Sequence, residues 1–225
     1  MSDRVTVAII DSGVNVPHPH LPGVAGGVGI DLRGDVSEDC VDVLGHGTAV
    51  AAAIHEKAPT AELLAVKVFH RELATTARTL VRALDWASER GVRLVNLSLG
   101  TPLELRAAEL EPAIGRAVRA GSLIVSAFEL DGHPWYPGCM EGVVGVLLDA
   151  EQPRETVTVG RRGERHVLRA SPYPRPIPGV PRERNLNGIS FAVANATGCL
   201  AAVLAGHGRV RSAAEAVELL ARSPG

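Results

Sequence analysis

The chain has 225 residues, of which 46% are hydrophobic, 21% charged and 3% aromatic. This apolar content is enough for the core of one globular domain, and we expect a single domain over residues 1–225. The formal net charge is −2 and the 23 lysines and arginines are spread along the chain, which argues against nucleic acid or an anionic membrane as a partner. No apolar run reaches the roughly 18–20 residues of a membrane span. No signal-peptide pattern is visible, so we expect a cytoplasmic protein.

Short apolar runs alternate with helical patterns in the first 150 residues. Five runs are apolar nearly throughout, which indicates strands buried on both faces; they lie at 5–10, 63–69, 94–99, 123–128 and 142–148. The helical patterns between them lie at about 46–55, 75–91 and 104–120. The alternation predicts an α/β fold with a mainly parallel sheet between two layers of helices, that is, a three-layer α/β/α fold.

The pattern changes after residue 150. Segments 155–160 and 165–170 are predicted to be two antiparallel strands around a turn. The next stretch, SPYPRPIPGVPRERN, contains five prolines and is predicted to be a long loop without regular structure. Helical patterns resume at about 190–205 and 212–223. The three cysteines, Cys40, Cys139 and Cys199, show no CxxC spacing, and we expect thiols rather than a disulfide or metal site.

Three polar residues stand at the ends of buried elements, each near a glycine. Asp11 ends the first strand in VAIIDSGVN, His46 opens an alanine-rich helix in DVLGHGTAVAAAI, and Ser190 opens another in NGISFAVANATG. Each alone fits an ordinary turn, cap or core residue equally well, since Asp favours turns and Ser favours helix starts. However, the carboxyl ends of strands are where α/β sheets bind ligands, which places Asp11 well for chemistry.

Together these residues form a possible set of orienting acid, general base and nucleophile. A serine hydroxyl needs a general base within hydrogen-bond reach, and a buried carboxylate fixes the tautomer of the imidazole that serves as this base. The helix N-terminus beneath Ser190 would add backbone N–H groups and a positive dipole where an oxyanion develops. The three residues therefore indicate nucleophilic acyl transfer.

The same segments resemble those of the subtilases, the subtilisin-like serine proteases, whose triad follows the order Asp, His, Ser. Three further segments agree in family order: APTAELLAVKV, ALDWASERGVRLVNLSLG and YPG at 136–138. The resemblance implies a subtilisin-like fold and a serine endopeptidase without a cofactor. It implies Asp11, His46 and Ser190 as the catalytic residues.

The resemblance also implies that a peptide substrate lies extended beside two segments of the chain, by strand addition. The implied substrate-binding residues are Ser98, Leu99, Gly100, Ser126, Ala127 and Phe128. Phe128 replaces a glycine that in the family forms a wall of the pocket for the residue before the scissile bond. Thr101 and Pro102 stand where many members have glycine. Both departures predict a selective enzyme with a particular peptide substrate, as in peptide maturation.

The largest departure from the family lies at SAFELDG, residues 126–132. The family has Ala-Gly-Asn here, and the Asn side chain donates a hydrogen bond to the oxyanion. Aligned without a gap, Glu129 stands at this oxyanion-hole position, where an ionised carboxylate only accepts hydrogen bonds. Loss of the donor costs roughly 10²–10³ in rate. Four alternatives stay open: Glu129 is protonated and donates, it swings away, the chain binds peptides without cutting them, or the loop is shifted and Glu129 is a solvated turn residue.

No metal site is expected. In the segment HPHL, His20 replaces the family's Asp, a calcium ligand in some members, and no compact loop rich in Asp or Asn takes over. The eight histidines show no HExxH-type spacing.

The leading hypothesis is therefore a serine endopeptidase that acts on a peptide or protein through an acyl-enzyme. Its rival is a pseudoprotease, a catalytically impaired peptide-binding module. The complete set of Asp, His and Ser favours the enzyme, whereas Glu129 favours the rival. A third alternative keeps the triad for acyl transfer or for maturation of one dedicated precursor.

Overall fold

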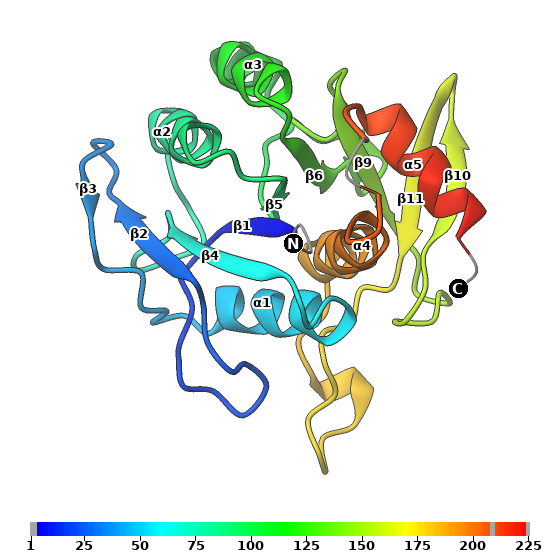
Figure 1. Ribbon diagram of the computed structural model, residues 1–225, viewed down its shortest axis with the longest axis horizontal. Coiled ribbons are helices and arrows are strands. Elements are labelled where there is room, and N and C mark those ends of the chain that lie inside the picture. Colours follow the sequence, from blue (N-terminus) through cyan, green and yellow to red (C-terminus); the bar gives the residue numbers. More distant parts are fainter. Residues whose placement is uncertain (1–3, 208–209, 224–225) are drawn as a thin grey trace.

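A mostly parallel sheet forms the centre of the molecule (Figure 1). Over residues 4–207 and 210–223, which the computed structural model describes, the chain forms a nine-stranded sheet of order β10-β11-β9-β6-β5-β1-β4-β2-β3. Its strands are β1 (Thr6–Asp11), β2 (Gly26–Ile30), β3 (Val36–Ser37), β4 (Glu62–Lys67), β5 (Leu94–Leu97), β6 (Leu123–Ala127), β9 (Val143–Leu148), β10 (Thr158–Arg162) and β11 (Arg165–Ala170). Only β3 and β10, the two edge strands, pair antiparallel with their neighbours.

Helices cover both faces of this sheet (Figure 1). They are α1 (His46–Lys57), α2 (Ala77–Glu89), α3 (Glu104–Arg119), α4 (Ile189–Leu204) and α5 (Ala213–Arg222). Residues of β1 alternate between the two resulting cores: Val7 and Ile9 pack with α1 and α4, and Ala8 and Ile10 pack with α2 and α3. The expectation of a three-layer α/β/α fold is therefore confirmed.

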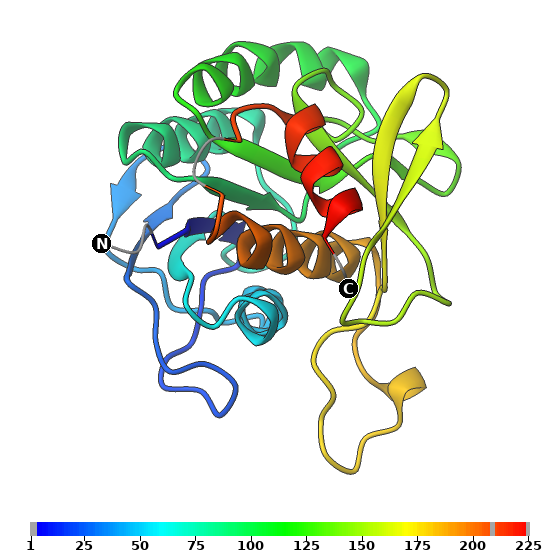
Figure 2. The ribbon, with the colours of Figure 1, turned by 45° about the vertical axis from the view of Figure 1, so that its right-hand side comes forward.

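Helix α4 runs through the core beneath the sheet and is buried along most of its length (Figure 2). Its small residues allow a close approach to α1. A Cβ built on Gly198 would lie 3.0 Å from the Cβ of Lys57 and 3.1 Å from the carbonyl oxygen of Ile54. This close packing fixes the position of α4 relative to α1, and both helices carry residues of the site described below.

Sequence patterns missed four short strands, among them β2, whose sequence GGVGI has low strand propensity. Its glycines are required by close packing. A Cβ on Gly27 would lie 2.5 Å from the carbonyl oxygen of Ala65, and one on Gly29 would collide with the carbonyl oxygen of Asp39. The other missed strands are β3 and the hairpin of β7 (Glu129–Leu130) and β8 (His133–Pro134).

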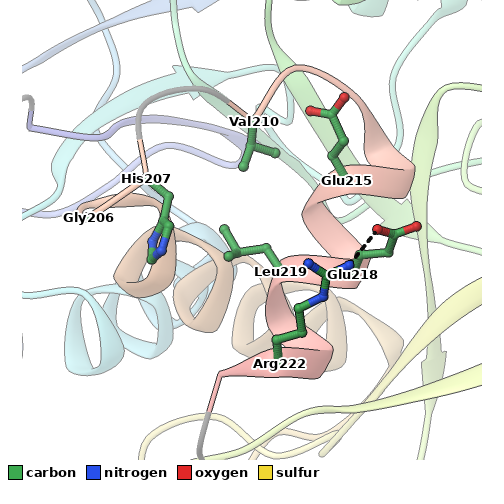
Figure 3. A pocket seen from close by; sticks show the side chains of 7 residues that line it. All are labelled: Gly206, His207, Val210, Glu215, Glu218, Leu219 and Arg222. Carbon is green, nitrogen blue, oxygen red and sulfur yellow. Dashed lines mark hydrogen bonds and ion pairs between the residues drawn. The ribbon is translucent and has the colours of Figure 1, made fainter.

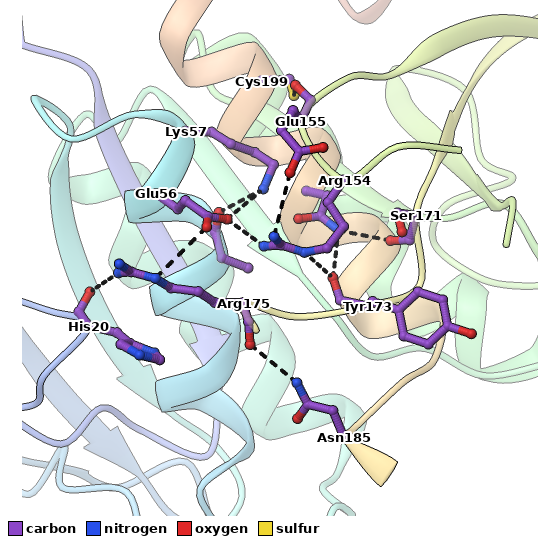
Figure 4. Close-up of polar contacts among 12 residues, drawn as sticks. His20, Glu56, Lys57, Arg154, Glu155, Ser171, Tyr173, Arg175, Asn185 and Cys199 are labelled. Atoms are coloured by element: carbon purple, nitrogen blue, oxygen red, sulfur yellow. Dashed lines mark hydrogen bonds and ion pairs between the residues drawn. The ribbon is translucent and has the colours of Figure 1, made fainter. Parts of the chain in front are cut away.

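The proline-rich segment leaves the body of the molecule as a long loop before it returns to α4 (Figure 2). It is irregular as predicted, apart from one 3₁₀ turn at Arg182–Arg184. Charges fix its base (Figure 4): Glu56 of α1 pairs with Arg154, with Arg175 at 3.8 Å and with Lys57 at 3.3 Å. The Asn195 amide of α4 donates to the carbonyl oxygens of residues 171 and 173, at 2.8 and 3.0 Å.

The three cysteines Cys40, Cys139 and Cys199 are free thiols. Within the part of the chain that the structure describes, no helix combines the length and apolar character needed to cross a membrane.

Candidate active site

Asp11 and His46 meet at the carboxyl edge of the sheet. Asp11 is the last residue of β1, which pairs with β4 on one side and β5 on the other, and His46 is the first residue of α1. The Nδ1 atom of His46 lies 2.7 Å from Oδ1 of Asp11, whose side chain is fully buried. The N–H of Ser12 donates to the same oxygen at 2.8 Å. The carboxylate therefore orients the imidazole through Nδ1 and leaves Nε2 for another partner.

The electrostatic surroundings favour a protonated imidazole. Burial lowers the pKa of His46, but the hydrogen bond and negative charge of Asp11, together with the charge of Asp42, outweigh it and hold that pKa above the ordinary 6.5. Because the folded-state pKa is raised, protonation of His46 stabilises the fold. This contribution is fully present below the unfolded pKa and is lost as the pH rises through the folded pKa.

An NMR titration should resolve these opposing effects. We expect the midpoint of the His46 ring to lie above 6.5 in the wild type and to fall below 6.5 in Asp11→Asn, because burial then outweighs the remaining charge of Asp42. His46→Gln assigns the resonance, and Asp35→Asn, which changes an exposed carboxylate, is the control. An unchanged midpoint in Asp11→Asn would contradict the assigned cause.

A second carboxylate, Asp42, holds the turn that leads to His46. Its Oδ1 accepts hydrogen bonds from the Ser12 hydroxyl at 2.8 Å and from the N–H groups of residues 44 and 45, and its Oδ2 accepts from the N–H and hydroxyl of Thr48. Burial raises the pKa of Asp42, but these hydrogen bonds outweigh it and lower the pKa below 3.8. Sequence analysis overlooked Asp42, although an Asp just before a helix start is a capping signal.

Ser190 lies in the first turn of α4, against the end of β5. Its hydroxyl donates to the carbonyl oxygen of Ser98 at 3.1 Å, and the Ser98 hydroxyl donates to the carbonyl oxygen of Ser190 at 3.2 Å. The ring of Phe191, the next residue, has its centroid 5.5 Å from that of His46. The fold thus places Ser190 at a helix N-terminus, with its hydroxyl turned toward Ser98 and with the following residue, Phe191, beside the His46 ring.

A buried polar network fixes Ser98 in turn. The amide of Asn96 in β5 donates to the Ser98 hydroxyl at 2.8 Å, and the Thr197 hydroxyl of α4 donates to the Asn96 oxygen at 3.0 Å. Asn96 and Thr197 are fully buried. The network joins the end of β5 to α4, so the position of Ser190 relative to the strand does not depend on one contact alone.

The two predicted substrate-binding segments differ in accessibility. Ser98 is nearly buried, whereas Leu99 and Gly100 are partly exposed beyond the end of β5. Ser126 and Ala127, in contrast, are buried within β6, between β5 and β9. An added strand could therefore pair with the backbone of residues 99 and 100, whereas the backbone of residues 126 and 127 is largely inaccessible to it.

Phe128 is partly exposed and contacts several neighbouring segments. Its N–H donates to the carbonyl oxygen of Val146 at 2.8 Å, and its own carbonyl oxygen accepts from the N–H of Trp135 at 3.0 Å. Its ring lies against Gly145, where a built Cβ would be 2.6 Å from the ring, and 5.3 Å below the Arg165 guanidinium. These contacts fix the ring between β9 and β11.

Glu129 begins a hairpin that the Asp-Gly dipeptide at 131–132 turns. Both turn residues have positive φ, 51° and 78°, as two-residue hairpin turns require, so Asp-Gly was the available sequence signal. The Glu129 carboxylate accepts hydrogen bonds from Arg162 of β10 at 3.1–3.3 Å. The same ion pair raises the pKa of Arg162.

Two cavities lie beside the candidate site. One, of about 460 Å³, adjoins Leu99, Gly100 and Thr101 and extends between α2 and α3. The other, of about 580 Å³, lies between the outer face of α1 next to His46 and the proline-rich loop, with Ala49 and Ile177 among its lining residues. A cavity of about 520 Å³ beside α5 lies at the opposite end of α4 from Ser190 (Figure 3).

No metal ligand set was found in the described parts of the chain. Among residues 4–207 and 210–223, no three His, Cys, Asp or Glu side chains gather closely enough to hold a metal ion. His18 and His20, which frame the proline of the HPHL segment, form an edge-to-face pair with ring centroids 5.4 Å apart.

The chain is similar to known proteins in sequence and in fold. The chain is 37% identical over 132 residues to Subtilisin Savinase of Lederbergia lenta, covering 55% of this chain and 46% of that protein. It is 32% identical over 161 residues to the Intracellular serine protease of Paenibacillus polymyxa, covering 63% and 48%. The chain thus spans about half of the length of these relatives, or less.

A solved structure described as a cold adapted subtilisin-like serine proteinase has the same fold. It superposes with a TM-score of 0.73 at 20% identity, covering 96% of this chain and 81% of that one. The model of the Subtilase family matches residues 2–128, which include Asp11 and His46. With more than half of its length matched by that model, the chain belongs to the subtilase family.

Proposed function

We propose that the chain is a serine endopeptidase that uses Asp11, His46 and Ser190. The observation that carries this proposal is the 2.7 Å contact between the His46 ring and the buried Asp11 carboxylate, at the start of α1. Phe191, the residue after Ser190, has its ring centroid 5.5 Å from that of His46. Membership of the subtilase family supports the roles of Asp11 and His46, which lie within the matched residues 2–128, and Ser190 follows them in the family's order Asp, His, Ser.

In the proposed mechanism, Nε2 of His46 takes the proton of the Ser190 hydroxyl as its oxygen attacks a peptide carbonyl. The hydroxyl first turns from the Ser98 carbonyl oxygen toward His46, by rotation about its own Cα–Cβ bond. Asp11 stabilises the imidazolium that forms, and the N–H groups at the start of α4 stabilise the oxyanion. His46 then passes the proton to the leaving amine, and water, activated by His46, hydrolyses the acyl-enzyme and releases Ser190.

The substrate is proposed to be an extended peptide that pairs with residues 98–100. The partly exposed backbone at Leu99 and Gly100 supports this placement, as does the cavity of about 460 Å³ at their side. We infer a selective enzyme with a particular peptide substrate, because the cavity offers a defined shape rather than a flat surface. Similarity to the Intracellular serine protease of Paenibacillus polymyxa supports action in the cytoplasm.

The rival proposal, a peptide-binding pseudoprotease, draws support from two observations. The Ser190 hydroxyl is hydrogen-bonded to the Ser98 carbonyl oxygen, and the gapless alignment with the family puts an acidic residue, Glu129, at the position of the Asn donor. The intact Asp11–His46 pair weighs against this rival, because peptide binding alone has no need for it.

Labelling with a fluorophosphonate distinguishes the two proposals, since this probe reacts only with an activated serine. We expect the wild type to be labelled between about pH 5 and pH 9, with a rate that rises as His46 loses its proton. Ser190→Ala should remove labelling. Absence of labelling in the wild type across this range, at protein concentrations where a subtilisin standard reacts fully, would favour the pseudoprotease.

The ion pair between Glu129 and Arg162 is proposed to keep the carboxylate away from the developing oxyanion. Arg162→Ala should therefore slow labelling by about tenfold, because a freed negative charge opposes the oxyanion. Glu129→Gln should restore the rate in the Arg162→Ala background and change it little in the wild type. If Arg162→Ala slows labelling equally with Glu or Gln at position 129, the effect is not electrostatic and this role for the pair is wrong.

A further inference from the structure

Trp135 lies against Gly100, in the segment that is proposed to pair with a substrate. A Cβ built on Gly100 would lie 2.5 Å from Nε1 and 2.6 Å from Cδ1 of the Trp135 indole, and it would also collide with the carbonyl oxygen of Tyr136. The indole ring is therefore in direct contact with Gly100. Sequence analysis assigned no role to Trp135.

The backbone around Trp135 is fixed from three directions. Its N–H donates to the carbonyl oxygen of Phe128 at 3.0 Å, and its carbonyl oxygen accepts from the N–H of Cys139 at 3.0 Å. The next residue, Tyr136, exchanges two hydrogen bonds of 2.9 Å with Thr101. Trp135 thus connects the segment after β6 to the segment after β5, and the indole packs on the core cluster that contains Phe191.

The substrate residue whose carbonyl is attacked must approach the segment that Trp135 contacts. The Ser190 hydroxyl lies 3.1 Å from the carbonyl oxygen of Ser98, so a carbonyl carbon under attack has to come next to the start of the 98–100 segment. The side chain of that substrate residue then lies between this segment and the one that follows β6. Because the indole contacts Gly100 and belongs to the segment that follows β6, we infer that it fills part of this space.

In contrast to the space that Trp135 occupies, a cavity lies open beside Leu99, Gly100 and Thr101. The cavity of about 460 Å³ begins at Leu99 and Gly100 and continues to Leu73 and Leu110, and Trp135 does not line it. A bulky apolar side chain therefore has room farther along the strand, but not next to Ser190.

We propose that Trp135 limits the substrate residue on the acyl side of the scissile bond to a small side chain, glycine or alanine. This inference rests on the proposed function for the position of the substrate. It deepens that function by replacing Phe128 with Trp135 as the residue that restricts the pocket.

Peptide binding tests the inference independently of catalysis. In the Ser190→Ala form, fluorescence anisotropy measures the affinity for labelled hexapeptides Ala-Ala-Ala-X-Ala-Ala, with X either alanine or phenylalanine. We expect the alanine peptide to bind at least about tenfold more tightly. Trp135→Gly should strengthen binding of the phenylalanine peptide by about tenfold or more, because an aromatic ring can then be buried, and change the alanine peptide by less than about threefold.

Two controls fix the register of the peptide and the integrity of the fold. A hexapeptide with phenylalanine three residues earlier, opposite the open cavity, should gain nothing from Trp135→Gly but should lose affinity in Leu73→Ala. Trp135→Phe, a smaller change that is safer for folding, should give an intermediate ratio of affinities.

The inference is overturned if the two peptides bind equally well to the Ser190→Ala form, if the ratio of their affinities is the same with Trp, Phe and Gly at position 135, or if neither binds saturably. Fluorophosphonate labelling of the wild type is measured separately. If the wild type is not labelled but the peptides bind with the expected ratios, the proposed catalysis is wrong and the selectivity assigned to Trp135 stands.

Discussion

Replacing His46 with alanine should lower the rate of fluorophosphonate labelling by about 10⁴-fold or more, because Ser190 then has no general base. In subtilisin, a member of the same family, loss of the serine or the histidine costs about 10⁶ in kcat. The pair with Asp11 supports a loss of this order here, since the buried carboxylate serves to orient the imidazole. Labelling rates should be compared at one pH above the pKa of His46.

His55 supplies the matched control for this experiment. It lies on the same helix as His46, near the other end, and burial and the charge of Arg175 lower its pKa. His55→Ala should leave the labelling rate within about twofold. A His46→Ala rate within about tenfold of the wild type would show that Ser190 is activated by another group, and the proposed mechanism would then be wrong.

Asp42→Ala should lower the free energy of unfolding by about 3–5 kcal/mol, the largest effect on stability that we expect. Five donors lose their acceptor in this variant, including the Ser12 hydroxyl and the N–H and hydroxyl of Thr48. Unmet buried donors cost more than the hydrogen bonds alone contribute. Urea unfolding at pH 7 measures the loss, and Asp35→Ala, at an exposed carboxylate, should change stability by less than about 0.5 kcal/mol.

The pH dependence identifies the cause of this loss. Because the folded-state pKa of Asp42 is lowered, its ionised form contributes stability above the unfolded pKa near 3.8, and this is lost as the pH falls through the folded pKa. The difference between the wild type and Asp42→Ala should therefore shrink in acid. A difference that stays constant down to pH 2 would point to a packing defect instead.

The sequence predicted those features that depend on local patterns. Continuous apolar runs identified β1 and β4 to β6, because strands buried on both faces contain few polar residues. Asp11 and His46 were predicted to act together and the structure brings them into contact. Their catalytic role remains a prediction, as does that of Ser190.

Features that depend on distant contacts were missed. The glycine-rich β2 lacks strand propensity, and only the backbones of residues 39 and 65 explain its glycines. Trp135 is 35 residues away from Gly100, and no local pattern reports their contact. Asp42 is different, because four of its five hydrogen bonds come from residues 44, 45 and 48 and only the one from the Ser12 hydroxyl spans a long stretch of the chain.

The position of α4 has a consequence for how the chain folds during its synthesis. The apolar side of the sheet around Val7, Ile9 and Val125 packs against this late helix, which also carries Ser190. A ribosome-bound chain that has not reached residue 189 therefore exposes this apolar surface and contains Asp11 and His46 without Ser190. Under the proposed function, completion of the core and arrival of the nucleophile are the same event, and an unfinished chain cannot attack neighbouring polypeptides.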